Sequence, residues 1–242
     1  YLLGEIDFNT RLKVSTSQWP LIQELLVSDD LICPSAWQRQ QFPLLWRDRI
    51  RVIFDGVNTS LFKPGKIEGE LAFSSGTECD SLTIKPSDRV LSYATRGMEP
   101  LRGFPEFMRA AVAAQRANSD VHVVIAGQDR VVYSEPSSHP TGSWKLQLLE
   151  ELSNDLDFSR LHFVGLLNYG ELANLFRRSD LHCYFTRPYV VSWGMYEAAA
   201  SGSRLLVNQF PGLQEVLDTT NLLVPPIDID DQDAIDAAVI QG

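Results

Sequence analysis

The stretch "RVLSYATRGMEPLRGFPEFMRAAVAAQRANSDVHVVIAG", residues 89–127, decides the fold class. It begins with an apolar run at 89–94, passes through a loop into an amphipathic segment at 104–116, and ends in a second apolar run at 121–127. Continuous apolar runs of this length, separated by a helical pattern, are typical of parallel strands that are buried on both faces. The stretch therefore predicts a strand, a helix and a second strand.

The same alternation continues through the rest of the chain. Further strand candidates lie at 161–165, 181–185, 203–208 and 221–225, and helical segments lie at 145–153, 170–179, 193–201 and 213–217. This order predicts an α/β domain with a doubly wound parallel sheet, a Rossmann-like arrangement with right-handed crossovers. Such sheets bind ligands beyond the carboxyl ends of their strands, where the strand order reverses. We therefore expect the functional site in the loops that follow the strands.

The first part of the chain has a different texture. Residues 8–29 fit a helix, a second helix is expected to begin after a cap at Ser35, and 51–54 form a strand candidate. Residues 66–85 are rich in Gly, Ser, Thr and Glu and show no periodicity, which predicts a loop or linker.

The composition limits the partners. The 242 residues are 44% hydrophobic and 21% charged, as in globular proteins, and the net charge is −10. Because nucleic acids bind basic faces, nucleic acid is not an expected partner, although a local arginine cluster can still hold a phosphate. Cys33, Cys79 and Cys183 are far apart and lack metal-binding spacing, so we expect reduced thiols in a cytoplasmic protein. The chain does not begin with methionine, and we expect a fragment or a processed form.

The loop "ATRGMEPLRGF" (94–104) holds two arginines. Arg96 stands just past a strand, and Arg102 and Gly103 stand where the next helix begins. Guanidinium groups beside a helix N-terminus predict an anion site, because backbone N–H groups and the helix dipole add to their charge. Two solvated arginines in a surface loop are the alternative. No G-x-G-x-x-G follows a strand and no G-x-x-x-x-G-K-[ST] is present, which disfavours dinucleotide dehydrogenases and P-loop enzymes.

The stretch "PYVVSWGMYEAAASG" (188–202) places aromatic and small residues around one carboxylate. Ser192 is expected to cap a helix that Gly202 ends in a left-handed conformation, and Gly194 permits close approach of a ligand. Glu197 suits the vicinal hydroxyls of a ribose; the alternative is an acid that stabilises a helix N-terminus. No histidine pairs with a Ser or Cys in a nucleophile signature, so hydrolase chemistry is not indicated.

Four pieces of the chain together resemble the donor-binding half of a GT-B glycosyltransferase of the retaining group 1, or family 4, type. They cover nearly all of residues 30–224 and are specific as a set. In chain order they are "PSAWQRQQFP…RIRVIFDGVNTSLFKP", "ATRGMEPLRGF", "RLHFVGLLNYGELANLFRRSDL" and "SWGMYEAAASGSRLLVNQFPGLQEVL".

The resemblance implies roles for single residues. Arg96 and Arg102 would hold the diphosphate of a nucleotide sugar and, as the catalytic residues, stabilise its growing charge. Glu197 would bind the donor ribose, and the "VGLL" segment, Val164 to Leu167, would lie against the base. The donor-binding residues that the resemblance implies are Gly97, Gly103, Val164, Gly165, Leu166, Tyr189, Ser192, Trp193, Gly194 and Glu197.

The chain departs from the family pattern at two positions. Tyr189 stands where the family has the first acid of its Glu, seven residues, Glu pattern, which puts the identity of the donor sugar in doubt. Arg102 replaces the usual Lys, with one extra residue in the loop; the charge is kept, while the geometry changes.

By the same resemblance, residues 1–61 are a remnant of an N-terminal acceptor domain with the crossover, 62–88 a linker or loop, and 89–242 the nucleotide-sugar-binding domain. The expected function is transfer of a sugar, with retention, to a glycan, lipid-linked or small-molecule acceptor, as in polysaccharide biosynthesis. The expected partners are the donor, the acceptor and the missing N-terminal domain; peripheral membrane association of the full-length protein is left open. No cofactor or metal is expected, since no acidic cluster suits Mg²⁺. A sugar-nucleotide epimerase and a non-catalytic nucleotide-sugar-binding module are the alternatives.

Overall fold

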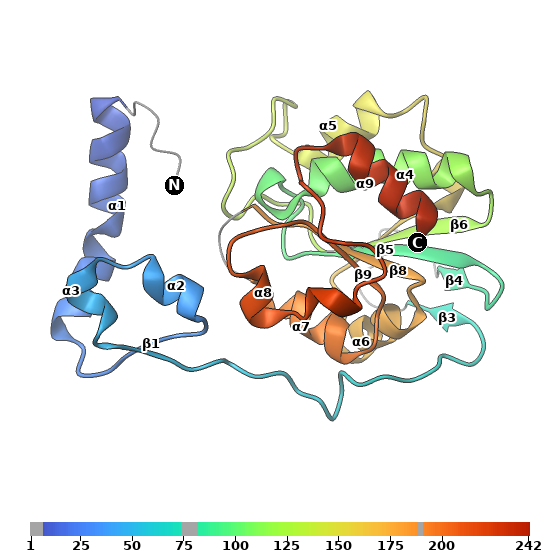
Figure 1. Ribbon diagram of the computed structural model, residues 1–242. Helices are drawn as coiled ribbons and strands as arrows, with labels where there is room; N and C mark the ends of the chain where they lie inside the picture. Colours follow the sequence, from blue (N-terminus) through green and yellow to red (C-terminus); the bar gives the residue numbers. More distant parts are fainter. Residues whose placement is uncertain (1–6, 74–81, 188–190) are drawn as a thin grey trace. The chain divides into compact units, whose positions relative to one another are not determined.

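The computed structural model describes residues 7–73, 82–187 and 191–242 (Figure 1). By its internal contacts the chain divides into two compact units, Tyr1–Asp55 and Gly56–Gly242. This division comes earlier in the chain than the boundary after residue 61 that we expect from the sequence. No helix among the described residues is long and apolar enough to cross a membrane.

The first unit combines short helices with a two-stranded parallel sheet. Its elements are α1 (Phe8–Val27), β1 (Leu31–Cys33), α2 (Ala36–Gln40), α3 (Leu44–Arg47) and β2 (Ile50–Val52). The predicted cap is confirmed, because the Ser35 hydroxyl accepts a hydrogen bond from the backbone N–H of Gln38 at 3.1 Å. The Arg49 guanidinium donates to the carbonyl oxygens of Leu25 and Ser28, at 3.3 and 2.9 Å, and so ties the segment before β2 to the end of α1.

The segment between the two predicted domains is part of the second unit. It contains a small antiparallel pair, β3 (Leu71–Ala72) and β4 (Thr83–Ile84). Phe73 and Ile84 are at most 1% exposed and pack with residues of the main sheet, and Phe62 is buried in a second apolar cluster. The described part of 62–88 is therefore packed into the second unit, whereas the sequence predicts a linker or loop. The sequence pattern does not reveal this packing because the buried apolar residues do not recur at a fixed spacing.

The centre of the second unit is the predicted doubly wound parallel sheet, which is confirmed. Its strands are β5 (Arg89–Ala94), β6 (Val121–Ala126), β7 (Leu161–Gly165), β8 (Leu181–Tyr184) and β9 (Leu205–Val207), all parallel. Their order across the sheet is β7-β6-β5-β8-β9. The order therefore reverses between β5 and β8, which is the topological switch point at which such sheets bind ligands.

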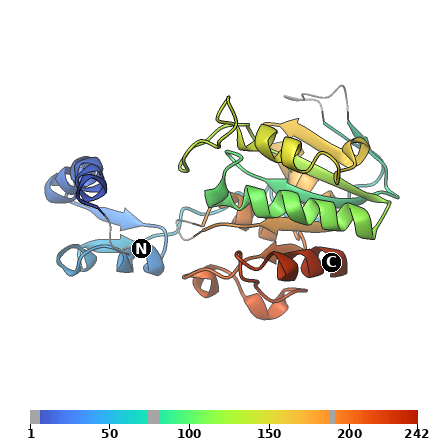
Figure 2. The ribbon, with the colours of Figure 1, turned by 90° about the horizontal axis from the view of Figure 1, so that it is seen from above.

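Helices cover both faces of this sheet (Figures 1 and 2). One layer holds α4 (Phe104–Ala117), α5 (Trp144–Glu151) and α9 (Gln232–Gln241), and the other holds α6 (Tyr169–Arg178), α7 (Trp193–Ala200) and α8 (Leu213–Val216). Leu91 and Tyr93 of β5 join the cluster beneath α4, whereas Val90 joins the cluster on the opposite face. Alternate residues thus bury both faces, as the continuous apolar runs predict. Where the structure describes it, the unit also contains the 3₁₀ turns η1 (Pro100–Arg102), η2 (Phe158–Arg160) and η3 (Thr219–Asn221).

One prediction near the C-terminus is wrong, and one helix there was not predicted. Residues 221–225 do not form a strand; the backbone there leads into Pro225 and Pro226, which have no N–H to donate. The chain instead pairs once with the sheet, through a parallel bridge between Asn208 and Ile227. The helix α9, which packs against α4, was not expected from the sequence.

Candidate functional site

The two predicted clusters follow β5 and β8, the strands on either side of the switch point. A backbone hydrogen bond joins their loops, because the N–H of Arg187 donates to the carbonyl of Leu101 at 3.0 Å. The side chain of Asn208, just after β9, accepts from the N–H of Thr186 and donates to its carbonyl, both at 2.8 Å. The loops after β5, β8 and β9 are therefore held together at the carboxyl end of the sheet.

Arg187 also forms ion pairs at this end of the sheet. Its guanidinium contacts the carboxylates of Glu106 at the start of α4 and of Asp230, both at 2.7 Å. Burial lowers the pKa of Arg187, but the hydrogen bonds and charges of the two acids outweigh it and raise the pKa. This arginine fixes the loops rather than offering its charge to a ligand, and its role was not predicted from the sequence.

The loop after β5 presents arginines at its two ends. Arg96 is exposed, and the guanidinium of the half-buried Arg102 lies 5.4 Å from the centre of the Tyr133 ring. Tyr93 donates from its hydroxyl to the carbonyl of Arg102 at 2.7 Å; its pKa is raised by burial, so it stays protonated. A third arginine, Arg130 in the loop after β6, donates to the carbonyl of Arg96 at 3.3 Å. Its signal in the sequence was its place in the loop that follows a strand.

The two glycines of this loop serve packing in the structure. Gly103 has a φ of +66°, and a Cβ there would lie 2.3 Å from the Cβ of Phe185. A Cβ at Gly97 would lie 2.7 Å from the carbonyl oxygen of Arg130. Both glycines thus let segments of the protein approach each other closely.

The helix α7 begins at the predicted position. Ser192 is its N-cap residue and Gly202, with φ of +79°, follows its C-terminus. The Ser192 side chain makes no capping hydrogen bond; its backbone N–H donates to the Tyr184 hydroxyl at 2.9 Å. Among the described residues, a Cβ at Gly194 would come within 4 Å only of the Ser192 hydroxyl oxygen, at 3.8 Å. Trp193 is 59% exposed at the start of the helix.

Glu197 is half-buried on α7, and no described residue donates a hydrogen bond or forms an ion pair with its carboxylate. Burial raises the pKa of this group because the carboxylate loses solvation without gaining a partner. A buried carboxylate in this state is stabilised by any ligand that donates hydrogen bonds to it.

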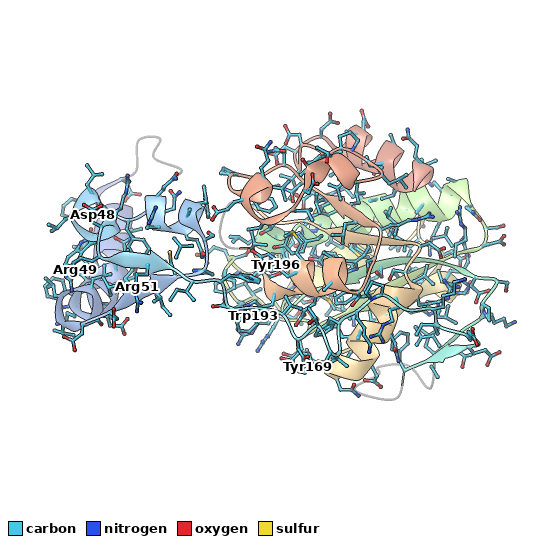
Figure 3. The ribbon with its side chains drawn as sticks, turned by 60° about the horizontal axis from the view of Figure 1, so that its bottom comes forward. Asp48, Arg49, Arg51, Tyr169, Trp193 and Tyr196 are labelled. Atoms are coloured by element: carbon cyan, nitrogen blue, oxygen red, sulfur yellow. The ribbon has the colours of Figure 1, made fainter. Side chains whose placement is uncertain are left out.

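The three residues that are predicted to contact the base differ in their exposure to solvent. Val164 is 1% exposed, with its side chain in the core, and Gly165 accepts a hydrogen bond from the N–H of Gly127 at 2.8 Å. Leu166 is 51% exposed, so it alone of the three offers a side chain to solvent. Figure 3 shows the exposed rings nearby, Tyr169 on α6 and Trp193 on α7. Tyr189 lies outside the described residues, as does Cys79.

No group of three or more His, Cys, Asp or Glu residues in the described ranges could hold a metal ion. His122 and His162 stack at the amino ends of β6 and β7, with 2.9 Å between Nδ1 of one and Nε2 of the other. Burial, and then the neighbouring His122, lower the pKa of His162 to about 4. His182 is buried against the Ser92 hydroxyl at 2.7 Å, and burial lowers its pKa to about 3. These histidines belong to the sheet rather than to the candidate site.

Residues 4–62 match the family described as "Glycosyl transferase family 4 group". A search of the curated proteins found no match. Among solved structures, TarM from S. aureus is similar with a TM-score of 0.64 and 13% identity over 93% of this chain and 39% of that one. The chain thus spans well under half of TarM.

Two other structures are similar. Sucrose-phosphate synthase from Thermosynechococcus elongatus has a TM-score of 0.60 and 17% identity over 99% of this chain and 59% of that one. The C-terminal domain of a glycosyl transferase group 1 family protein, LpcC, from Francisella tularensis has a TM-score of 0.53 and 17% identity over 76% of this chain and 88% of that one. The fold is that of the GT-B glycosyltransferases. The resemblance to their group 1 type, inferred from the sequence, is confirmed.

Proposed function

We propose that the second unit binds the nucleotide-sugar donor of a glycosyltransferase that transfers the sugar with retention. The observation that carries the proposal is the position of the two predicted clusters, which follow β5 and β8 on either side of the switch point. Nucleotides bind at this place in doubly wound sheets. The hydrogen bond between Arg187 and Leu101 keeps the two loops close enough to serve one ligand.

In this proposal Arg96 and Arg102 bind the diphosphate, with Arg130 beside them. Transfer breaks the bond between the anomeric carbon and a phosphate oxygen, and the negative charge on the leaving diphosphate grows. Guanidinium groups that are already held in place stabilise this charge without reorganising during the reaction. We propose that this step needs no metal ion.

Glu197 is proposed to accept hydrogen bonds from the donor ribose. Its half-buried carboxylate receives no hydrogen bond from the described residues, and two vicinal hydroxyls supply donors for both oxygens. Ser192, Trp193, Gly194 and Tyr189 are the proposed surroundings of the sugar. Leu166 is proposed to lie against the base through its exposed side chain.

UDP is the first nucleotide to test, because TarM and the pneumococcal O-GlcNAc transferase GtfA, both of this fold, have been crystallised with UDP. The acceptor is proposed to be a glycan, a lipid-linked sugar or a small molecule, bound mainly by the N-terminal acceptor domain that the resemblance implies. A cytoplasmic role in polysaccharide biosynthesis belongs to the same proposal.

A direct test incubates the full-length protein with a panel of labelled nucleotide sugars and an acceptor extract. Two results together support the proposal: release of the nucleoside diphosphate, and a product whose new glycosidic bond has the same anomeric configuration as the donor. Epimerised donor without an acceptor, or tight binding of UDP without any turnover, contradicts transfer and leaves the nucleotide-binding site in place.

A further inference from the structure

Glu99 lies between the two arginines of the β5 loop and is completely buried. Its Oε2 accepts three backbone hydrogen bonds, from the N–H groups of Val132 at 2.9 Å and of Tyr133 and Ser134 at 2.8 Å each. Successive backbone N–H groups that converge in this way form a concave anion-binding site. Here the anion is a side chain of the protein itself.

Further contacts join the loops after β5 and β6 into one block. The N–H of Met98 donates to the carbonyl of Gln128 at 3.1 Å, and the N–H of Leu101 donates to the Ser134 hydroxyl at 3.1 Å. A buried carboxylate is strongly destabilised unless it is hydrogen-bonded. Glu99 thus links the two loops through three charge-assisted hydrogen bonds to its Oε2.

This block determines what surrounds Arg102. The residue whose N–H lies in the middle of the three donors, Tyr133, is the one whose ring lies 5.4 Å from the Arg102 guanidinium. From the other side, Tyr93 holds the Arg102 carbonyl at 2.7 Å. A long arginine side chain loses conformational entropy when a ligand immobilises it, and a neighbour that already restricts it reduces that loss.

We propose that Glu99 is a positioning residue, which fixes the 132–134 backbone so that Tyr133 holds Arg102 in place for a diphosphate. The inference rests on the proposed function for the role of Arg102. It goes beyond that function by assigning a task to an acid that touches no ligand. An acid close to a diphosphate site is expected to weaken binding through its charge, whereas a positioning acid strengthens it.

This opposition gives a decisive test. Glu99→Gln keeps one acceptor oxygen and the side-chain size but removes the charge. The matched control is Glu135→Gln, which removes the same charge from an exposed position in the same loop. We expect pyrophosphate, measured by calorimetry on the full chain, to bind roughly 5- to 10-fold more weakly to Glu99→Gln and equally well or slightly better to Glu135→Gln.

A double-mutant cycle asks whether Glu99 acts through Arg102. In an Arg102→Ala background, Glu99→Gln is expected to cause no further loss of pyrophosphate affinity, since the group that it positions is gone. Amide hydrogen exchange at 132–134 is expected to accelerate in Glu99→Gln and to stay unchanged in Glu135→Gln and Arg102→Ala.

Three results overturn the positioning role: unchanged exchange at 132–134 in Glu99→Gln, tighter pyrophosphate binding by it, or an equal loss in both backgrounds. The proposed diphosphate site fails by a different result, namely parental affinity in both Arg96→Ala and Arg102→Ala. In that case the positioning role falls with it, while faster exchange in Glu99→Gln would identify Glu99 as a purely structural link.

Discussion

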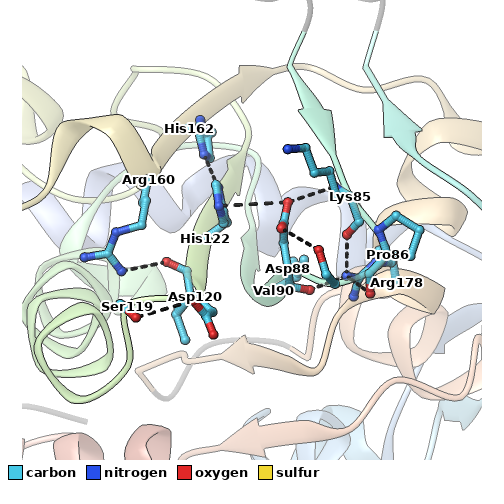
Figure 4. Close-up of polar contacts among 12 residues, drawn as sticks. Lys85, Pro86, Asp88, Val90, Ser119, Asp120, His122, Arg160, His162 and Arg178 are labelled. Atoms are coloured by element: carbon cyan, nitrogen blue, oxygen red, sulfur yellow. Dashed lines mark hydrogen bonds and ion pairs between the residues drawn. The ribbon is translucent and has the colours of Figure 1, made fainter.

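The two ends of the same parallel sheet treat their charged groups differently. At the amino end the groups satisfy one another (Figure 4). The Asp88 carboxylate accepts from the N–H of Lys85 at 2.8 Å, and Arg178 donates to the carbonyls of Lys85, at 3.0 Å, and of Asp88. The His122 and His162 rings pair beside them.

At the carboxyl end the balance is different. Arg96 is exposed, and the half-buried Glu197 receives no hydrogen bond from the described residues. Charges that the protein satisfies stabilise its fold, whereas charges that it leaves without donors are available to a ligand. The contrast thus indicates which end of the sheet works on a substrate, and mutations at the two ends should affect different quantities.

The largest expected effect is on stability, at the amino end. Arg178 is 11% exposed, contacts Asp180 at 3.2 Å and satisfies several backbone carbonyls. Arg178→Ala removes a guanidinium that donates to several backbone carbonyls and pairs with Asp180, so we expect a loss of roughly 3 kcal/mol in the free energy of unfolding, measured in urea. Affinity for UDP at a temperature where the variant is folded should match the parent. A weakened UDP affinity with full stability would remove the distinction between the two ends.

The next effect is on binding, at the carboxyl end. Arg102→Ala should weaken UDP binding by about 1.5–3 kcal/mol, or roughly 10- to 150-fold, because a charge-assisted contact to phosphate is lost. The melting temperature should change little. Arg109→Ala, which removes an exposed arginine from the middle of α4, is the control and should bind UDP like the parent. Equal affinities for all three proteins would mean that the arginines after β5 are surface charges.

A smaller effect is expected at Glu197. Glu197→Gln replaces a charged acceptor by an amide with a single acceptor oxygen, so UDP affinity should fall by about 1 kcal/mol, roughly 5-fold. Pyrophosphate has no ribose and should bind as before. If the carboxylate instead stabilises α7 through the helix dipole, the variant should melt earlier and lose little affinity for either ligand.

The last effect concerns pH at the amino end. The pKa of His162 is about 4 in the folded protein, below its ordinary value of 6.5, so the unfolded chain binds this proton first. The contribution of His162 is therefore complete above about pH 6.5 and is lost as the pH falls toward 4. His162→Gln should flatten the loss of unfolding free energy between pH 7 and 5, compared with His139→Gln in a loop. His182 acts in both variants, since its pKa is lowered to about 3 by burial. If the free energy of unfolding of His162→Gln falls as steeply with pH as that of the parent, the lowered pKa of His162 does not contribute to stability.

The strands of the main sheet could be predicted because each depends on a local property. Residues 89–94 and 161–165 are apolar runs with clear ends, and the structure has strands at the same bounds. The predicted strand at 221–225 fails because the prolines that follow cannot continue a backbone ladder, and pairing moves to Ile227. The pair of β3 and β4 depends on burial of single apolar residues, which no period reveals.

The site could be predicted only where local chemistry reveals it. Arg96 and Arg102 stand out because one follows a strand and the other precedes a helix, and Glu197 stands out as the single carboxylate of a helix made largely of aromatic and small residues. The tasks of Glu99 and Arg130 depend on the loop after β6 lying against the loop after β5, which follows from the order of the strands rather than from either loop. Gly103 shows that a residue type can fit two roles, because a phosphate-binding loop and a close packing contact both favour glycine.

Asn208 has a consequence for how this sheet ends. A carboxamide carries one donor group and one acceptor, as a peptide unit does, and Asn208 uses both on the N–H and C=O of Thr186. The side chain therefore replaces one backbone hydrogen-bonded pair beyond the end of the β8–β9 ladder. The two main chains can separate after this point without leaving the N–H and C=O of Thr186 unpaired. The loops that follow Thr186 and Asn208 can therefore differ in length and composition while the hydrogen bonds at the end of the sheet are kept. Asn208→Asp, which removes the donor, would leave the carbonyl of Thr186 without this hydrogen bond and loosen the end of the sheet.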